Sequence, residues 1–96
     1  MTVPAAVLRV IGEVDACSLL RFRGEADELL LDERVRELVV DLSETTALGV
    51  MGLGLLLHLK MLACENAIGL AVRAVPPAIR SVLAVGGLDR VLEIRD

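Results

Sequence analysis

Apolar runs and helical periodicities alternate along the 96-residue chain. Residues 7–11 (Val-Leu-Arg-Val-Ile) are β-branched and apolar and end at Gly12, which predicts a strand. Asp15 is a good helix N-cap, and apolar residues then recur at helical spacing from Ala16 to about Leu31. Charged residues occupy the other positions of this segment. The pattern therefore predicts a first strand followed by an amphipathic helix.

The middle of the chain repeats this order with more apolar residues. Residues 38–42 (Leu-Val-Val-Asp-Leu) form a nearly continuous apolar run, typical of a strand in the middle of a sheet that is covered on both faces. A polar loop at 43–46 precedes a second helix, predicted from about Val50 to Glu65. Apolar residues nearly encircle this helix, so more than one stripe of its side chains must be buried against other elements or a partner. One stripe contains Leu53, Leu56, Leu57, Met61 and Cys64, while Leu55, Leu59 and Leu62 lie off it.

The last third predicts a strand, a short helix and a final strand. Residues 68–75 form the strand, which Pro76 ends because it cannot donate to a ladder. The helix is expected over Pro77–Val85 with Ile79, Val82 and Leu83 facing inward, and two glycines at 86–87 supply a left-handed exit. Residues 91–94 are the final strand. Strands alternate with helices throughout, so we expect one α/β domain over residues 1–96, with about four mostly parallel or mixed strands and helices packed against them.

Composition and charge narrow the expected partners. Hydrophobic residues make up 55% of the chain and Phe22 is the only aromatic, so the core must be aliphatic. The net charge of -4 and the absence of a basic cluster argue against nucleic acid as a direct partner. We expect no membrane insertion, and the N-terminus lacks a secretory signal pattern, which favours a cytoplasmic location. Cys17 and Cys64 have no CxxC spacing and are expected to be reduced, small core residues.

The residue types needed for catalysis do not converge. His58 is the only histidine, with no second ligand at metal-binding spacing, so a structural role is expected and no metal or cofactor. Residues 49–54 (Gly-Val-Met-Gly-Leu-Gly) follow a strand, but the third glycine of a dinucleotide-binding turn would fall at Leu57, and a P-loop would need Gly-Lys-Ser/Thr. These glycines are expected instead to let the helix start pack closely. The sequence therefore predicts a protein that is not an enzyme.

Four short motifs resemble the STAS family, whose founders are bacterial anti-sigma factor antagonists. They are Gly-Glu-Val-Asp at 12–15, Asp-Leu-Ser at 41–43, Gly-Leu-Gly at 52–54, and the Pro-led helix from 77 with Gly-Leu at 87–88 before the last strand. Their order and spacing match the family from about Val7 to Ile94. The resemblance implies a module that binds an anti-sigma factor of the serine-kinase type, or a related switch protein, and so frees a sigma factor for transcription.

The family's switch differs in this sequence. In the family, an Asp-Ser-Ser-Gly or Asp-Ser-Thr-Gly turn opens the second helix, and the kinase phosphorylates its first Ser. Here residues 49–52 read Gly-Val-Met-Gly, so Val50 stands at that position and cannot accept phosphate. Phosphate would add close to two negative charges and repel a docked partner. The resemblance thus implies binding without phosphorylation at the usual place.

The same resemblance indicates where partners bind. The predicted contacts are Thr45, Thr46, Gly49, Val50, Met51 and Leu53. The pair Val50 and Met51 is either a partner contact that phosphorylation cannot switch off or simply part of the hydrophobic packing. Ser43, Thr45 and Thr46 are substitute phosphate acceptors, although turn hydrogen bonds explain them more economically.

Two further expectations concern assembly. Many relatives have another helix after the last strand, so Leu55, Leu59 or Leu62 is expected to be uncovered, making the second helix a surface for a homodimer or a partner. The alternative function is a structural or regulatory STAS subunit of a membrane transporter ATPase complex.

Overall fold

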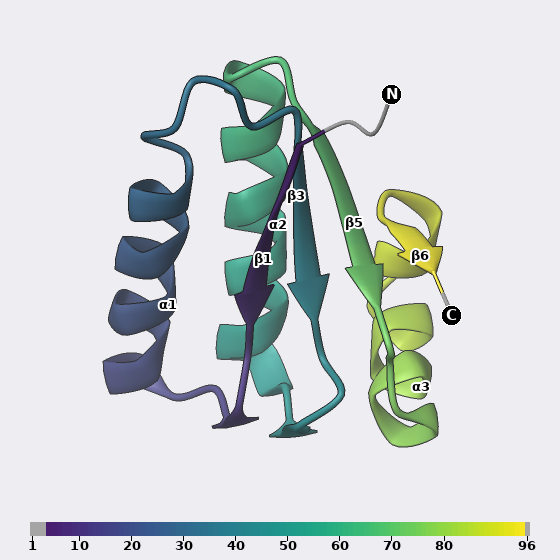
Figure 1. Ribbon diagram of the computed structural model, residues 1–96. Helices are drawn as coiled ribbons and strands as arrows, with labels where there is room; N and C mark the ends of the chain where they lie inside the picture. Colours follow the sequence, from purple (N-terminus) through teal and green to yellow (C-terminus); the bar gives the residue numbers. More distant parts are fainter. Residues whose placement is uncertain (1–3, 96) are drawn as a thin grey trace.

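A computed structural model describes residues 4–95, in which four parallel strands form a sheet with helices behind it (Figure 1). The elements, in chain order, are β1 (Ala5–Arg9), β2 (Gly12–Glu13), α1 (Ala16–Leu29), β3 (Glu37–Asp41), β4 (Thr45–Ala47), α2 (Gly49–Glu65), β5 (Gly69–Arg73), α3 (Pro77–Val85), a 3-10 turn η1 (Leu88–Arg90) and β6 (Glu93–Arg95). The predicted α/β class and the alternation of strands with helices are confirmed.

The sheet has the strand order β1-β3-β5-β6, and every pairing in it is parallel. The predicted place of residues 38–42 in the middle of the sheet is correct, because β3 pairs with β1 on one side and β5 on the other. Leu38 and Val40 are fully buried and point toward the helices. The short strands β2 and β4 pair with each other in a second, two-stranded sheet.

The core lies between the sheet and the helices. Helix α2 lies behind β1 and β3, α1 lies beside α2 and farther out than β1, and α3 lies near the other edge of the sheet (Figure 1). Buried aliphatic side chains fill the space, and Phe22 of α1 joins them. As expected from the sequence, Asp15 caps α1: its side chain accepts a hydrogen bond from the Ser18 backbone N–H at 2.9 Å, and the Ser18 hydroxyl accepts one from the Asp15 N–H at 2.9 Å.

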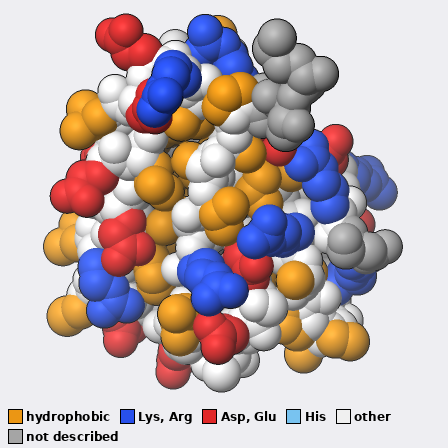
Figure 2. Space-filling model, in the orientation of Figure 1, with side chains coloured by type: hydrophobic (Ala, Val, Ile, Leu, Met, Phe, Trp, Pro, Cys, Tyr) orange, Lys and Arg blue, Asp and Glu red, His pale blue; other side chains and the backbone are white. Residues whose placement is uncertain are grey.

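The opposite face of the sheet faces the viewer in Figure 2, where apolar side chains lie among charged ones. Arg73 pairs with Asp41 at 3.0 Å, and Arg95 pairs with Glu37 at 2.7 Å. Val39 is nevertheless buried on this face, with 6% of its surface exposed. These ion pairs tie β6 and β5 to β3 from the front.

Several strand boundaries differ from the prediction, and β5 (Gly69–Arg73) ends two residues before the predicted residue 75. The strand expected over 7–11 ends at Arg9, and Gly12, at φ 81°, begins the separate strand β2. The loop expected at 43–46 contains the start of β4, whose partner β2 is distant in sequence. The last strand begins at Glu93 instead of residue 91, because the chain first forms the turn η1. By contrast, α3 has the predicted bounds, and Gly87 supplies the left-handed exit at φ 75°.

The orientation of α2 corrects the prediction about its faces. Leu55 and Leu59, expected to be uncovered, are 1% and 0% exposed and belong to the core. Leu57 and Met61 of the predicted stripe are instead 46% and 63% exposed. The prediction was wrong because a helix that is apolar all round has no periodic signal, and its orientation is set by packing against α1 and β5.

The two cysteines also correct the prediction. Cys17 and Cys64 are both exposed and free, although the sequence analysis placed them in the core. Small core positions on the same helices are taken by Ala26 and Ala63, which are 0% and 1% exposed. Residue type alone did not distinguish a small buried thiol from a solvent-facing one.

Candidate partner-docking surface

Helix α2 begins in a constrained turn directly after β4. Its N-cap residue, Leu48, has no side chain that bonds to the free N–H groups, and Gly49 has a left-handed backbone at φ 59°. A Cβ on Gly52 would lie 2.5 Å from Cγ of the buried Leu48. Gly52 is therefore required for Leu48 to pack beneath the first turn, as the expected close packing of the helix start implies.

The side chains of Val50 and Met51 project from this turn into solvent. Val50 is 86% exposed and Met51 is 44% exposed. Such exposure argues against the interpretation that Val50 simply extends the hydrophobic packing, since the side chain buries little surface. An aliphatic side chain held at an exposed helix start is instead available to another protein.

A shallow apolar hollow lies beside this turn, between α2 and α3. It has a volume of about 290 Å³ and is lined by Leu53, Ser81, Val82, Val85 and Gly86. Leu53 follows Val50 by one helical turn, so it connects the hollow to the exposed pair. The absent side chain of Gly86 leaves room for Leu53, whose Cδ1 lies 3.4 Å from the position that a Cβ would take.

Val85 is the residue of this surface that the sequence analysis missed. It is 91% exposed at the end of α3. The sequence did carry a signal for it: Val85 is apolar but was not among the residues of α3 predicted to face inward. We call Val50, Met51, Leu53 and Val85 the docking patch.

Of the other predicted contacts, Thr45 does not belong to the surface. Its side chain is buried, with 5% exposed, and its hydroxyl donates a hydrogen bond to the Val10 carbonyl at 2.6 Å. Thr45 therefore ties β4 to the segment that connects β1 and β2, and it is withdrawn both as a partner contact and as a substitute phosphate acceptor. Thr46 and Gly49 are exposed beside the patch.

Asp41 fixes the chain that leads into this turn. One carboxylate oxygen accepts hydrogen bonds from the Ser43 hydroxyl at 2.6 Å and the Ser43 N–H at 2.9 Å, and the other accepts one from Arg73 Nε at 3.0 Å. These bonds, led by the one from the Ser43 hydroxyl, lower the pKa of Asp41 to about 2. The ionised carboxylate thus holds Ser43 in an ordered turn ahead of β4.

The exposed apolar surface continues along α2. Leu57 and Met61 follow Leu53 at helical spacing and are 46% and 63% exposed. His58, between Leu57 and the buried Leu59, is half-buried. We call Val50, Leu53, Leu57 and Met61 the α2 stripe; it shares Val50 and Leu53 with the docking patch.

The described part of the chain holds neither a metal-binding cluster nor a membrane-spanning helix. Across residues 4–95, no group of three or more His, Cys, Asp or Glu side chains is placed to hold a metal ion. No helix between these limits combines the length and hydropathy needed to cross a bilayer.

Comparisons with known proteins agree with the fold and the motifs. The anti-sigma factor antagonist SpoIIAA in its unphosphorylated form has a TM-score of 0.79 at 19% identity, with 99% of this chain and 83% of that chain covered. The Bacillus cell fate determinant SpoIIAA in its phosphorylated form gives 0.71 at 19% identity, covering 99% and 86%. At this identity, the likeness demonstrates a shared fold.

The search among curated proteins finds no match for this sequence. The family described as "Mlab, STAS domain" matches residues 1–94, which is nearly the whole chain. The motifs quoted from the sequence, the strand order and this match agree, and the chain belongs to the STAS domain family.

Proposed function

We propose that this protein is a non-catalytic regulatory module that binds a serine-kinase-type anti-sigma factor, or a related switch protein, through the docking patch. The observation that carries the proposal is the exposure of Val50, 86%, where relatives have a phosphorylated Ser. Covering an aliphatic side chain of this size contributes about 1.5 kcal/mol or more to a complex. Met51, Leu53 and Val85 extend the apolar contact around it.

Binding through this patch is not switched at Val50. A valine has no oxygen to receive a phosphoryl group, so no charge is added at the helix start. The nearby hydroxyls are poor substitutes: Ser43 is engaged by Asp41, and Thr45 is buried against Val10. Thr46 and Ser43 are both exposed, and the Ser43 hydroxyl is the one that donates to Asp41. The complex is therefore expected to persist in the presence of ATP.

The direct test mixes the protein with a serine-kinase-type anti-sigma factor from the same organism and ATP. We expect a stable complex on a sizing column and no incorporation of labelled phosphate. Incorporation at Thr46 with release of the partner would overturn the unswitched part of the proposal. Failure to bind in the absence and presence of ATP would overturn the choice of partner.

A second candidate function is a structural or regulatory subunit of a membrane transporter ATPase complex. The favouring observation is the α2 stripe, because Leu57 and Met61 extend the apolar surface well beyond the helix start. A permanent subunit needs a larger apolar interface and no phosphate switch. Co-purification with an ATPase, and not with a kinase, would favour this candidate.

Either function places the protein in the cytoplasm. The exposed, unpaired thiols of Cys17 and Cys64 support this location, since a reducing compartment keeps such thiols from oxidising. The net charge of -4 and the lack of a basic cluster support protein partners over nucleic acid.

A further inference from the structure

Strand β1 lies at the edge of the sheet and has a free side. The Val10 N–H donates to the Asp41 carbonyl at 3.1 Å, so Val10 faces β3. Successive residues of a strand direct their N–H and C=O groups to opposite edges, so those of Val7 and Arg9 point away from the sheet. A row of outward main-chain groups is a template for another strand.

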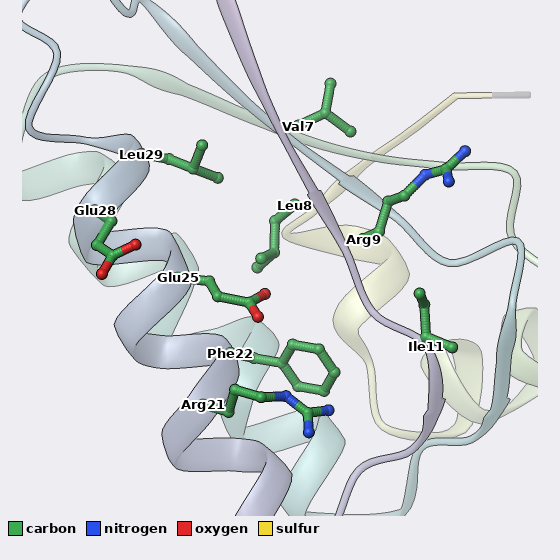
Figure 3. A pocket seen from close by; sticks show the side chains of 9 residues that line it. All are labelled: Val7, Leu8, Arg9, Ile11, Arg21, Phe22, Glu25, Glu28 and Leu29. Carbon is green, nitrogen blue, oxygen red and sulfur yellow. The ribbon is translucent and has the colours of Figure 1, made fainter.

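Helix α1 turns this free edge into a groove. The space between β1 and α1 has a volume of about 730 Å³. Figure 3 shows Leu8 pointing from β1 toward α1, where Phe22, Glu25 and Leu29 lie, while Val7, Arg9 and Ile11 project from the other side of the strand. Val7 is 39% exposed and Ile11 is 54% exposed. The groove therefore combines main-chain groups with apolar surface.

The charges along the groove have a direction. Arg21 lies over Phe22, with its guanidinium 4.9 Å from the centre of the Phe22 ring. Glu25 and Glu28 follow along α1 toward the end where Leu29 and Val7 lie (Figure 3). The α1 wall thus runs from basic to acidic, while Arg9 of β1 projects from the other side of the strand. The charges of α1 select a ligand with the opposite order of charges.

We propose that this groove binds an extended peptide segment of a partner protein, which adds to β1 as a further strand. The segment has apolar side chains at alternate positions, which lie beside the exposed Val7 and Ile11 on the front face of the sheet. Its other side chains face α1, with a basic residue opposite Glu25 and Glu28. Its other end is acidic and faces Arg21. The site is built from β1 and α1, so it stands independently of the docking patch on α2 and α3.

The position of α1 favours a single strand over a second copy of the chain. In Figure 1, α1 lies farther out than the edge strand β1. Pairing β1 with its own copy would bring two α1 helices into the same space. A single peptide strand would lie only about 4.8 Å from β1, in the plane of the sheet, so it would not have to displace α1.

The test is an NMR titration of the full chain with a synthetic nine-residue peptide. The peptide alternates valine with polar residues and has lysines at one end and glutamate at the other. We expect shifts at the amides of Val7, Arg9 and Ile11. A scrambled peptide with adjacent valines, and a peptide N-methylated at alternate amides, should bind at least about tenfold more weakly.

Variants of the protein test the charge order. Glu25→Lys should weaken binding of the alternating peptide roughly fivefold, because it removes an ion pair and adds a repulsion. The matched control is Asp27→Lys, on the same helix and outside the groove, which should leave binding unchanged. Val7→Pro removes an outward N–H and should abolish binding; should this variant not fold, the N-methylated peptide tests the same bond.

Three results would overturn the proposal. The first is equal binding of the alternating and scrambled peptides, or no shift at millimolar peptide. The second is a set of shifts centred on Val50 and Met51 instead of β1. The third is a dimer in sedimentation that Val7→Pro dissolves, since the groove would then hold a second copy.

Discussion

Gly52 and Gly54 lie half a turn apart on α2, but their surroundings differ. A Cβ on Gly52 would lie 2.5 Å from the Leu48 side chain, whereas one on Gly54 would meet nothing within 4 Å. Gly52→Ala is expected to lower the free energy of unfolding by about 1–3 kcal/mol, because Leu48 is buried. Gly54→Ala should raise it by about 0.5–1 kcal/mol. Urea unfolding at 25 °C measures both, and equal stabilities would contradict this packing.

Asp41 makes the free energy of unfolding depend on pH in the acidic range. Its pKa is lowered to about 2 in the fold, from 3.8, so the folded state binds this proton less tightly than the unfolded state. The resulting stability is complete above about pH 5 and is lost as the pH falls toward 2. The expected contribution is about 2 kcal/mol. The unfolding free energy should therefore differ less between pH 5 and pH 2 in Asp41→Asn than in the wild type, because the contribution of Asp41 is gone. The same difference in both proteins would contradict this role of Asp41.

At the scale of elements, α2 offers the sharpest test of orientation. Leu59 is 0% exposed and Leu57 is 46% exposed, although they are two residues apart. Leu59→Ala is expected to lower the unfolding free energy by about 2–5 kcal/mol through cavity formation. Leu57→Ala should change it by less than about 1 kcal/mol. Thermal and urea unfolding of the two variants check this, and similar losses would contradict the orientation.

The sequence predicted an element well when the element has local end signals and buries only one face. The capping box at Asp15 and the periodicity of α1 are local signals, and α3 begins with Pro77 and ends before two glycines; both helices were predicted well. The faces of α2 were not predicted, because every face of it is apolar. The burial of Thr45 depends on Val10, 35 residues earlier in the chain, and no local pattern carries such a contact.

The α2 stripe also predicts association at high concentration. Leu57 and Met61 expose apolar surface that a second copy can cover through a two-fold contact. We expect sedimentation velocity to show a dimer that forms with increasing protein concentration. Leu57→Glu should weaken this dimer by about tenfold or more, because it places a charge in an apolar contact. A strict monomer at every concentration would contradict self-association through α2.

At the scale of the whole molecule, the topology brings separate segments of the chain to one surface. The docking patch combines the start of α2 with the end of α3, although Val50 and Val85 are distant in sequence. The sequence predicted the α2 part, since it contains the motif positions 49–52, and missed the α3 part. The proposed groove lies on other elements, β1 and α1, so the small domain presents two independent surfaces.

The central claim is that the exposed side chain of Val50 anchors the partner. The most direct measurement is the affinity of a serine-kinase-type anti-sigma factor for Val50→Glu, compared with Leu20→Glu. Leu20 is 68% exposed on α1 and lies outside the docking patch, so it is a matched control. We predict that Val50→Glu weakens binding by about 100-fold, in the range of interface hot spots, while Leu20→Glu binds like the wild type. Equal affinities for wild type and Val50→Glu would contradict the account.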